Sequence, residues 1–453
     1  MKSVKASRCV VLLQALLACA WLQSASAQIN LTIYQSGPGQ VEEERDVNVR
    51  PGVTALVWQP VAARILPESL WLGAPRGVEL QGFELRLAPL TPATLLRAYA
   101  GRTIDVLTRD AAGREQRRTA LVLSADGPVL QINGRVESGP FRHLIFPALP
   151  PPLGQAPALV MDLRGGHSGR ALLDLNYLCG GLTWRADYVA RLSANGKNLA
   201  MIGWAALSNQ SGMDYADARV ALVAGQPHRA SPGAPFLLKG AMAAESVVVS
   251  AEAWQDYQRY VLPRPITLSD GATRWVGFFA QATMPLQREY VVNDTADYAN
   301  EAATGRQALP VAVLLHLPGT GQPLPAGVVR VYGTTHGHEA YLGEDRIAAL
   351  PRNTPFSIQL GRAFDVTASR VQTDFKRLGG APTPTYDSAW RIVLRNAQPQ
   401  PVRVKVTAQM PGDWEVLQES APHERPAAGT AQWRVPVGAE SEAVLSYRVR
   451  TRY

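Results

Sequence analysis

Apolar and polar positions alternate most regularly between residues 172 and 225. Three apolar runs in this stretch are separated by an Asn-Gly turn at 195–196 and by a polar cluster at 208–212. Alternation with a period of two, bounded by Gly-containing turns, is typical of antiparallel strands. The stretch therefore predicts a central antiparallel sheet. Tryptophans at strand positions here and further along are expected in the core: Trp184, Trp204, Trp275 and Trp390.

Shorter strand-like runs fill most of the remaining chain, and Gly or Pro residues separate them. Residues 91–101 are an exception, because Thr91 can cap a helix and Pro92 suits its first turn. The 38 Gly and 34 Pro residues favour turns over long helices. We therefore predict a mainly β, multi-domain protein of antiparallel β-sandwich and small-barrel units, with one or two short helices.

The pattern divides the chain into five parts. They are a signal peptide (1–27), an N-terminal β region (28–90), a small β-barrel-like unit (91–150), a central β-sheet domain (151–308) and a C-terminal immunoglobulin-like β-sandwich (309–453). Five prolines between residues 147 and 157 indicate a stiff connector into the central domain.

The N-terminus has the pattern of an export signal. Lys2, Lys5 and Arg8 precede an apolar run, and small residues end it at Ala27. We expect cleavage near Ala27 and a secreted or periplasmic protein; the alternative is a lipoprotein anchored at Cys19. No other segment is apolar enough to cross a membrane as a helix.

The charge distribution and the cysteine content limit which partners and which covalent cross-links we expect. The formal net charge is +8, but three of the cations lie in the signal-like segment and the others are dispersed. Because the sequence has no run of basic residues that could follow a phosphate backbone, nucleic acid is not an expected partner. Beyond the signal only Cys179 remains, so an intramolecular disulfide is excluded there and a buried thiol is expected.

Few residues suggest catalysis. His336 and His338 could chelate a metal from one strand face, although a hairpin tip is the other interpretation. Asp214 and Asp217 could serve a glycosidase or bind turn amides. Trp254 could stack on a sugar or a partner. The run 42–44 of three glutamates predicts a solvated edge-strand face.

No nucleophile elbow, zinc motif or phosphate loop is present in the sequence. We therefore expect no cofactor.

The central alternating stretch contains motifs that we expect to be structural, with the residues Tyr177, Trp184, Asp187, Tyr188, Asn209, Gly212 and Asp214. These motifs resemble those of secreted bacterial proteins that carry the domain of unknown function 4139. The resemblance covers most of the chain after residue 66 and implies a β-rich extracytoplasmic protein without assigning a reaction. A more distant likeness is to mucoidy inhibitor A-like proteins, which usually carry a coiled coil that is not seen here.

Together these features favour a non-enzymatic binding or structural protein of the bacterial cell envelope. Its partner would be an envelope protein or a glycan. One alternative is a carbohydrate-binding or carbohydrate-hydrolysing protein with paired carboxylates, and another is a metal-dependent hydrolase.

Overall fold

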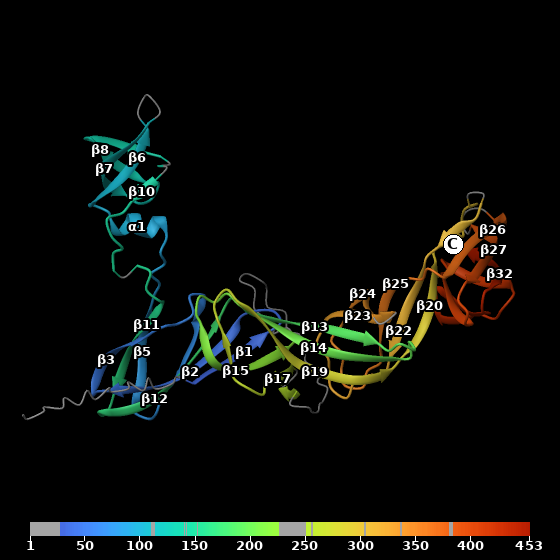
Figure 1. The fold of residues 1–453 in the computed structure, drawn as a ribbon, viewed down its shortest axis with the longest axis horizontal. Helices are drawn as coiled ribbons and strands as arrows, with labels where there is room; N and C mark the ends of the chain where they lie inside the picture. The colour runs from blue at the N-terminus through green and yellow to red at the C-terminus, as the bar shows by residue number, and fades with distance from the viewer. Residues whose placement is uncertain are drawn as a thin grey trace, which may run out of the picture.

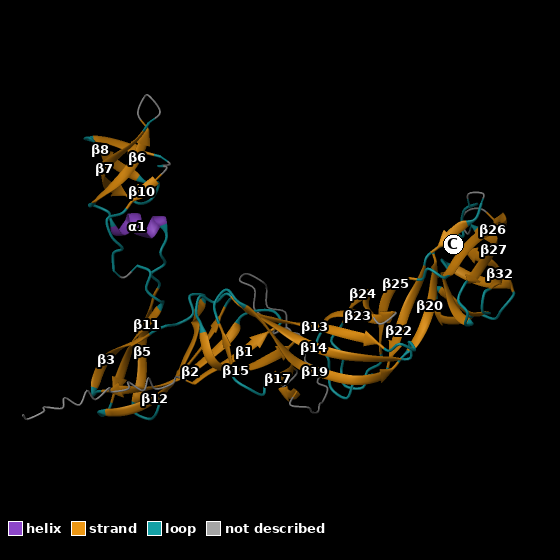
Figure 2. Cartoon of the chain, viewed as in Figure 1, coloured by secondary structure: helices purple, strands orange, loops and turns teal. Residues whose placement is uncertain are grey.

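The computed structural model describes residues 28–109, 114–139, 141, 143–151, 153–225, 251–254, 257–302, 305–335, 338–379 and 384–453. These residues form 32 strands and one helix, which confirms the mainly β fold (Figure 2). No helix among them is long and apolar enough to span a bilayer. Residues 1–27, which hold the expected signal and Cys19, lie outside the described part.

Apart from the sheet of a smaller projecting unit, the sheets follow one another along the long axis of the molecule (Figure 1). The largest contains eight strands, and β18 (Ile266–Leu268) joins it beside β15. Its β1 (Gln28–Tyr34) pairs in parallel with β15 (Tyr215–Ala224) and antiparallel with β2 (Gly39–Val49), so β1 lies inside the sheet. The main path runs β16 (Ala251–Trp254), β17 (Tyr257–Val261), β15 (Tyr215–Ala224), β1 (Gln28–Tyr34), β2 (Gly39–Val49), β12 (Gly169–Cys179) and β4 (Ile65–Gly73).

A three-stranded sheet lies beside it, in the order β3 (Gly52–Trp58), β11 (Ala158–Gly165) and β5 (Val78–Arg86). Both β11 and β12 come from the chain after residue 151, yet they pair with strands from residues 39–86. The N-terminal β region and the first strands of the central region therefore build their sheets together.

The stretch with the clearest alternation forms the middle of a five-stranded sheet. Its order is β19 (Thr273–Pro285), β14 (Asn198–Asn209), β13 (Leu182–Leu192), β23 (Gly327–Thr335) and β24 (His338–Ile347). One face of this sheet shares a core with the two preceding sheets. Trp184 is buried in that core, but Trp204 and Trp275 are 39% and 54% exposed on the outer face. The prediction that these two tryptophans are core residues was wrong, because only one face of the sheet is covered.

A smaller unit projects from one end of the molecule (Figure 1). Its helix α1 (Pro92–Ala98) begins after Thr91, whose side chain accepts a hydrogen bond from the Thr94 N–H, as the capping pattern predicts. The accompanying sheet is open, with β10 and β9 at its two edges, so it is not a closed barrel. Its order is β10 (His143–Ile145), β6 (Thr103–Arg109), β7 (Glu115–Ser124), β8 (Val129–Ile132) and β9 (Arg135–Ser138).

Two sheets at the other end enclose a second core, which contains Trp390 and Trp433. The first sheet runs β25 (Phe356–Arg362), β22 (Val311–Leu317), β20 (Gln287–Asp294), β28 (Val402–Gln409), β31 (Thr430–Val437) and β30 (Glu424–Ala427). The second runs β21 (Gln307–Leu309), β26 (Val366–Gly379), β27 (Thr385–Asn396), β32 (Ser441–Arg452) and β29 (Asp413–Glu419). This sandwich includes β20, which precedes residue 309.

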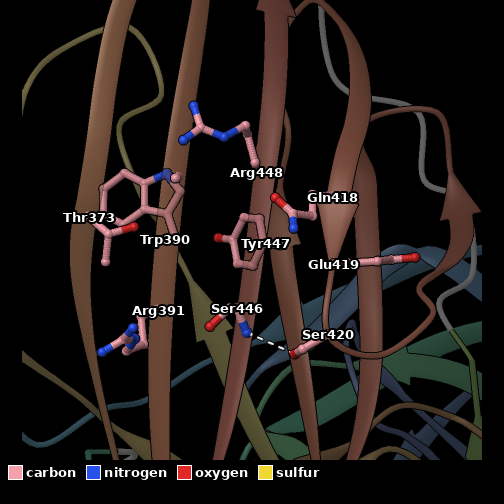
Figure 3. A pocket seen from close by; sticks show the side chains of 10 residues that line it. Thr373, Trp390, Arg391, Gln418, Glu419, Ser420, Ser446, Tyr447 and Arg448 are labelled. Atoms are coloured by element: carbon pink, nitrogen blue, oxygen red, sulfur yellow. Dashed lines mark hydrogen bonds between the residues drawn. The ribbon is translucent and has the colours of Figure 1, made fainter.

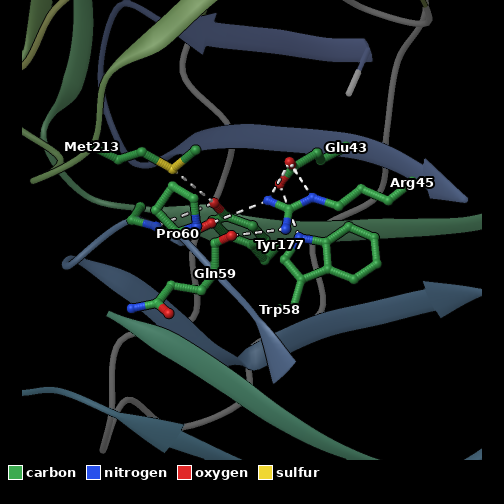
Figure 4. Close-up of polar contacts among 8 residues, drawn as sticks. Glu43, Arg45, Trp58, Gln59, Pro60, Tyr177 and Met213 are labelled. Carbon is green, nitrogen blue, oxygen red and sulfur yellow. Dashed lines mark hydrogen bonds and ion pairs between the residues drawn. The ribbon is translucent and has the colours of Figure 1, made fainter. Parts of the chain in front are cut away.

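The three consecutive glutamates differ from the edge-strand prediction. Their strand β2 lies between β1 and β12, so it is not an edge, and Glu43 is only 1% exposed. Glu43 Oε1 accepts a hydrogen bond from Arg45 Nε at 2.7 Å, and Glu43 Oε2 accepts one from Trp58 Nε1 at 3.0 Å (Figure 4). The Arg45 guanidinium also lies 4.6 Å from the Trp58 ring centroid. These partners satisfy the buried carboxylate.

Candidate functional site

A groove of about 550 Å³ lies on the outward face of β2, β12 and β4. We call it the Trp71 groove; its lining residues are Gln40, Glu42, Ser69, Trp71, Asp174, Asn176, Tyr177 and Leu178. Successive strand residues point to opposite faces, so β2 directs Val41 and Glu43 inward while Gln40 and Glu42 face the groove. Trp71 in β4 is 60% exposed. The groove therefore combines an open aromatic ring with hydrogen-bonding side chains.

Hydrogen bonds hold the polar side chains of the Trp71 groove in place. Gln40 Nε2 donates to Asn176 Oδ1 at 3.0 Å, and Asn176 Nδ2 donates to the two carboxylate oxygens of Asp174 at 3.1 and 3.2 Å. Both strands are rigid parts of one sheet, because β2 and β12 pair in register from Gly39 to Val49. The site thus presents pre-ordered donors and acceptors.

Carboxylates crowd this face. Asp174 lies directly opposite Glu44 in the β2–β12 register, and Asn176 lies opposite Glu42. Burial, together with the charges of Glu42 and Glu44, raises the pKa of Asp174 above its ordinary value. Among the described residues, no Lys or Arg forms an ion pair with these three carboxylates. Like charges on opposite cross-strand positions destabilise a sheet. This arrangement therefore lowers the stability of the protein when no ligand is bound.

A second exposed aromatic surface lies on the outer face of the five-stranded sheet. Trp204 stands opposite Gly277 in the β14–β19 register, and its ring lies 3.9 Å from where a Gly277 side chain would begin. Trp275 occupies the same face two residues before Gly277, and Ile202 is 45% exposed beside Trp204. The missing side chain at Gly277 leaves room for the Trp204 ring to lie along the sheet.

A smaller hollow of about 290 Å³ opens on the outer face of β27, β32 and β29, beside Trp390 and Tyr447 (Figure 3). Some of its polar groups have partners within the protein, although the buried Trp390 Nε1 has no hydrogen-bond partner among the described residues. Arg448 pairs with Asp374 at 2.7 Å, and Ser420 Oγ accepts the Ser446 N–H at 2.9 Å. Its two aromatic residues, Trp390 and Tyr447, are only 2% and 3% exposed, so the hollow offers a ligand no open aromatic face, unlike the Trp71 groove.

The predicted carboxylate pair lies elsewhere. Asp214 and Asp217 are both exposed. Asp214 Oδ1 accepts the backbone N–H of Asp270 at 2.7 Å, and the backbone N–H of Asp217 donates to Thr267 Oγ1 at 3.3 Å. Both residues therefore tie β15 to the segment 267–270, and neither lines the Trp71 groove.

The other predicted ligand residues are only partly described. Trp254 ends β16 opposite Tyr257, but its side chain is outside the described residues. His336 also lies outside them, and His338 is the exposed first residue of β24. Within the described ranges, no three His, Cys, Asp or Glu side chains gather as a metal site would require.

Most of the family-motif residues tie the first core together. Each of three buried aromatic side chains donates or accepts at a backbone group: Tyr177 OH accepts from Ala62 N (3.3 Å), Trp184 Nε1 donates to Val223 O (3.0 Å) and Tyr188 OH donates to Pro325 O (2.8 Å). On the outer face, Asp187 accepts from Arg185 and Arg330 at 3.0 and 3.2 Å.

Asn209 and Gly212 shape the turn between β14 and β15. The fully buried Asn209 amide donates to Met213 O and Leu268 O at 2.8 and 2.9 Å. Gly212 has a φ of +80°, and a side chain there would begin 2.4 Å from Ala63 Cβ. Only glycine fits such a position without strain, so this turn packs against residues 62–63.

The sequence did not single out Trp71, Gln40, Asp174 and Asn176 as site residues. Trp71 stands between two leucines in an apolar run, a pattern that indicates an ordinary strand residue. A usable signal was present in the polar alternate positions of β2 and β12, which mark one hydrophilic face. The pairing of these two strands could not be inferred from the sequence.

Comparison with known proteins gives a family. No curated protein matches the chain. The family model described as Domain of unknown function (DUF4139) matches residues 173–453, which begin within β12 and include Asp174 and Asn176 of the Trp71 groove. This match covers more than half of the chain, and the protein therefore belongs to the DUF4139 family.

Proposed function

We propose that this protein is a non-enzymatic glycan-binding protein of the bacterial cell envelope, with the Trp71 groove as its binding site. The observation that carries the proposal is the exposed Trp71 ring beside a fixed row of amide and carboxylate groups. The apolar C–H faces of a sugar ring stack on an indole, while its hydroxyls need both donors and acceptors. The groove supplies both kinds of contact.

The unpaired carboxylates support a ligand rich in hydroxyl or amino groups. Glu42, Glu44 and Asp174 are acceptors without a cationic partner among the described residues. Sugar hydroxyls, and the ammonium group of an amino sugar, would donate to them and reduce their mutual repulsion. An anionic sugar would be repelled from the same face.

The placement of the carboxylates favours binding over cleavage. A glycosidase uses two carboxyl groups on either side of the scissile bond. Glu42 and Asp174 project from neighbouring strands on one face of one sheet, so they would contact a sugar chain from the same side. We therefore propose recognition without hydrolysis.

The envelope location rests on the N-terminal sequence. The basic residues, apolar run and small residues up to Ala27 support export by a signal peptide. A lone Cys179 after that point suits a protein stabilised by burial in an oxidising compartment.

Isothermal titration with neutral oligosaccharides and with oligosaccharides of free amino sugars tests the proposal on the chain from Gln28 onward. We expect Trp71→Ala to weaken binding at least about tenfold, because an aromatic contact is lost from the centre of the site. Phe364→Ala is the matched control, since Phe364 is an exposed aromatic residue (93%) outside the groove. Equal affinity of Trp71→Ala and the original chain for every glycan that binds would overturn the proposal, as would no binding at all.

A further inference from the structure

A second groove, of about 500 Å³, lies on the outward face of the sandwich sheet that contains β22, β20, β28 and β31. We call it the basic groove; its lining residues are Gln287, Arg288, Glu289, His316, Arg403, Lys405 and Arg434. Arg403 and Lys405 are two residues apart in β28, so they share this face, and Lys405 lies directly opposite Arg434 in β31. The groove thus gathers cations from β28 and β31, and Arg288 at the start of β20 borders it.

The positive charge exceeds what the neighbouring carboxylates neutralise. Glu289 accepts hydrogen bonds from Lys405 Nζ at 2.6 Å and from His316 Nε2 at 2.8 Å, and Arg434 pairs with Glu424. Among the described residues, neither Arg288 nor Arg403 forms an ion pair. Lys405 and Arg434 are like charges on opposite cross-strand positions, which destabilise a sheet unless an anion lies between them.

A row of hydrogen bonds beside the groove could suggest a nucleophile. Ser357 Oγ lies 2.7 Å from His316 Nδ1, and His316 Nε2 lies 2.8 Å from Glu289 Oε2, in the order of a Ser–His–acid triad. Ser357, however, is the second residue of β25 and is not among the lining residues of the groove. Glu289 is also engaged by Lys405. This row therefore positions Glu289 and His316 at the groove wall and does not supply a nucleophile to it.

We propose that the basic groove binds the phosphoryl oxyanions of a phosphorylated ligand. A guanidinium group offers paired N–H donors that match the oxygens of a phosphoryl group, and Lys405 adds a compact positive charge. Cations that come from separate strands about 4.8 Å apart can hold two adjacent phosphoryl groups better than one. This site is independent of the Trp71 groove and carries the opposite charge.

Titration calorimetry with inorganic phosphate, pyrophosphate and acetate at constant ionic strength tests the proposal. We expect pyrophosphate to bind more tightly than phosphate, and acetate to bind least. Arg403→Gln should weaken pyrophosphate binding about tenfold, because it removes charge-assisted hydrogen bonds. Arg135→Gln is the matched control, since Arg135 is exposed on β9 of the separate small unit.

Three results would overturn the proposal. One is no heat of pyrophosphate binding above the chloride background. Another is a loss of affinity in Arg135→Gln equal to that in Arg403→Gln, which would indicate diffuse attraction to net charge. The third is tighter binding of acetate than of pyrophosphate, which would assign the groove to carboxylates. Because both substituted arginines lie at the protein surface, the variants should keep the fold, and their thermal unfolding checks this.

Discussion

Trp58 donates its indole N–H to the buried carboxylate of Glu43 at 3.0 Å, and Arg45 Nε donates to the other carboxylate oxygen at 2.7 Å. The three residues join β2 to the last residue of β3, and Arg45 Nη1 continues to the backbone oxygen of Gln59 at 2.9 Å. A carboxylate that is 1% exposed thus fixes how the eight-stranded and three-stranded sheets meet.

Glu43→Ala should destabilise the protein strongly. The substitution leaves Arg45 and the Trp58 N–H without their acceptor, and loss of one partner of a buried ion pair costs about 3–5 kcal/mol. Glu42→Ala is the control, because Glu42 is the adjacent residue on the outward face. Urea denaturation followed by tryptophan fluorescence measures the difference; equal losses in both variants would contradict the role assigned to Glu43.

Asp174→Asn should stabilise the protein at neutral pH while it weakens glycan binding. Burial and the charges of Glu42 and Glu44 raise the pKa of Asp174 in the folded state. A raised carboxyl pKa means that stability is lost as pH rises from the unfolded value through the folded one. The variant lacks this loss, so its advantage should be present at pH 7 and disappear in acid. Solvent screens these charges, so the advantage should not exceed about 1 kcal/mol, the upper range for one cross-strand pair.

Thermal unfolding of the chain and of Asp174→Asn from acid to neutral pH tests this sign. The exposed Asp162 of β11 provides a control, as Asp162→Asn removes a carboxylate away from the groove. A decrease in melting temperature of Asp174→Asn at pH 7 would show that the carboxylate stabilises the free protein. That result would contradict the interpretation that the crowded carboxylates lower stability when no ligand is bound.

Cys179 should resist thiol reagents in the native protein. Burial raises the pKa of its thiol to about 11, and its side chain lies fully inside the first core, 3.8 Å from Tyr215 OH. Reaction of the chain from Gln28 onward with a chromogenic disulfide should therefore be slow at pH 8 and rapid after unfolding in guanidinium. Rapid modification of the native protein would instead indicate local opening of β12.

The strands and the short helix were predictable because local signals determine them. The Asn-Gly turn at 195–196 and the alternation around it correspond to β13 and β14, and Thr91 caps α1 as expected. Alternation does not reveal which face of a strand will be covered, which is why Trp204 and Trp275 were misplaced. The burial of Glu43 depends on Arg45 and Trp58 meeting it in space, and a run of glutamates gives no sign of that.

The Trp71 groove could not be predicted from the sequence for a related reason. Gln40, Trp71 and Asp174 belong to β2, β4 and β12, and only the pairing of these strands brings them to one face. Asp174 and Asn176 alone read as the polar side of an amphipathic strand. A site composed of residues far apart in the sequence requires the register between strands, which the chain pattern does not contain.

The parallel pairing of β1 with β15 has a consequence for how the chain acquires its fold. Asn30 in β1 is the register partner of Arg219 in β15, so β1 cannot complete its parallel pairing until a segment about 190 residues downstream is available. Until the ribosome has released β15, β1 has an open edge. The side chains of Ile29, Leu31 and Ile33 then lack some of the core residues that bury them in the folded protein. The N-terminal sheets must therefore assemble late and cooperatively, and nascent or truncated chains that end before β15 should depend on chaperones to avoid aggregation.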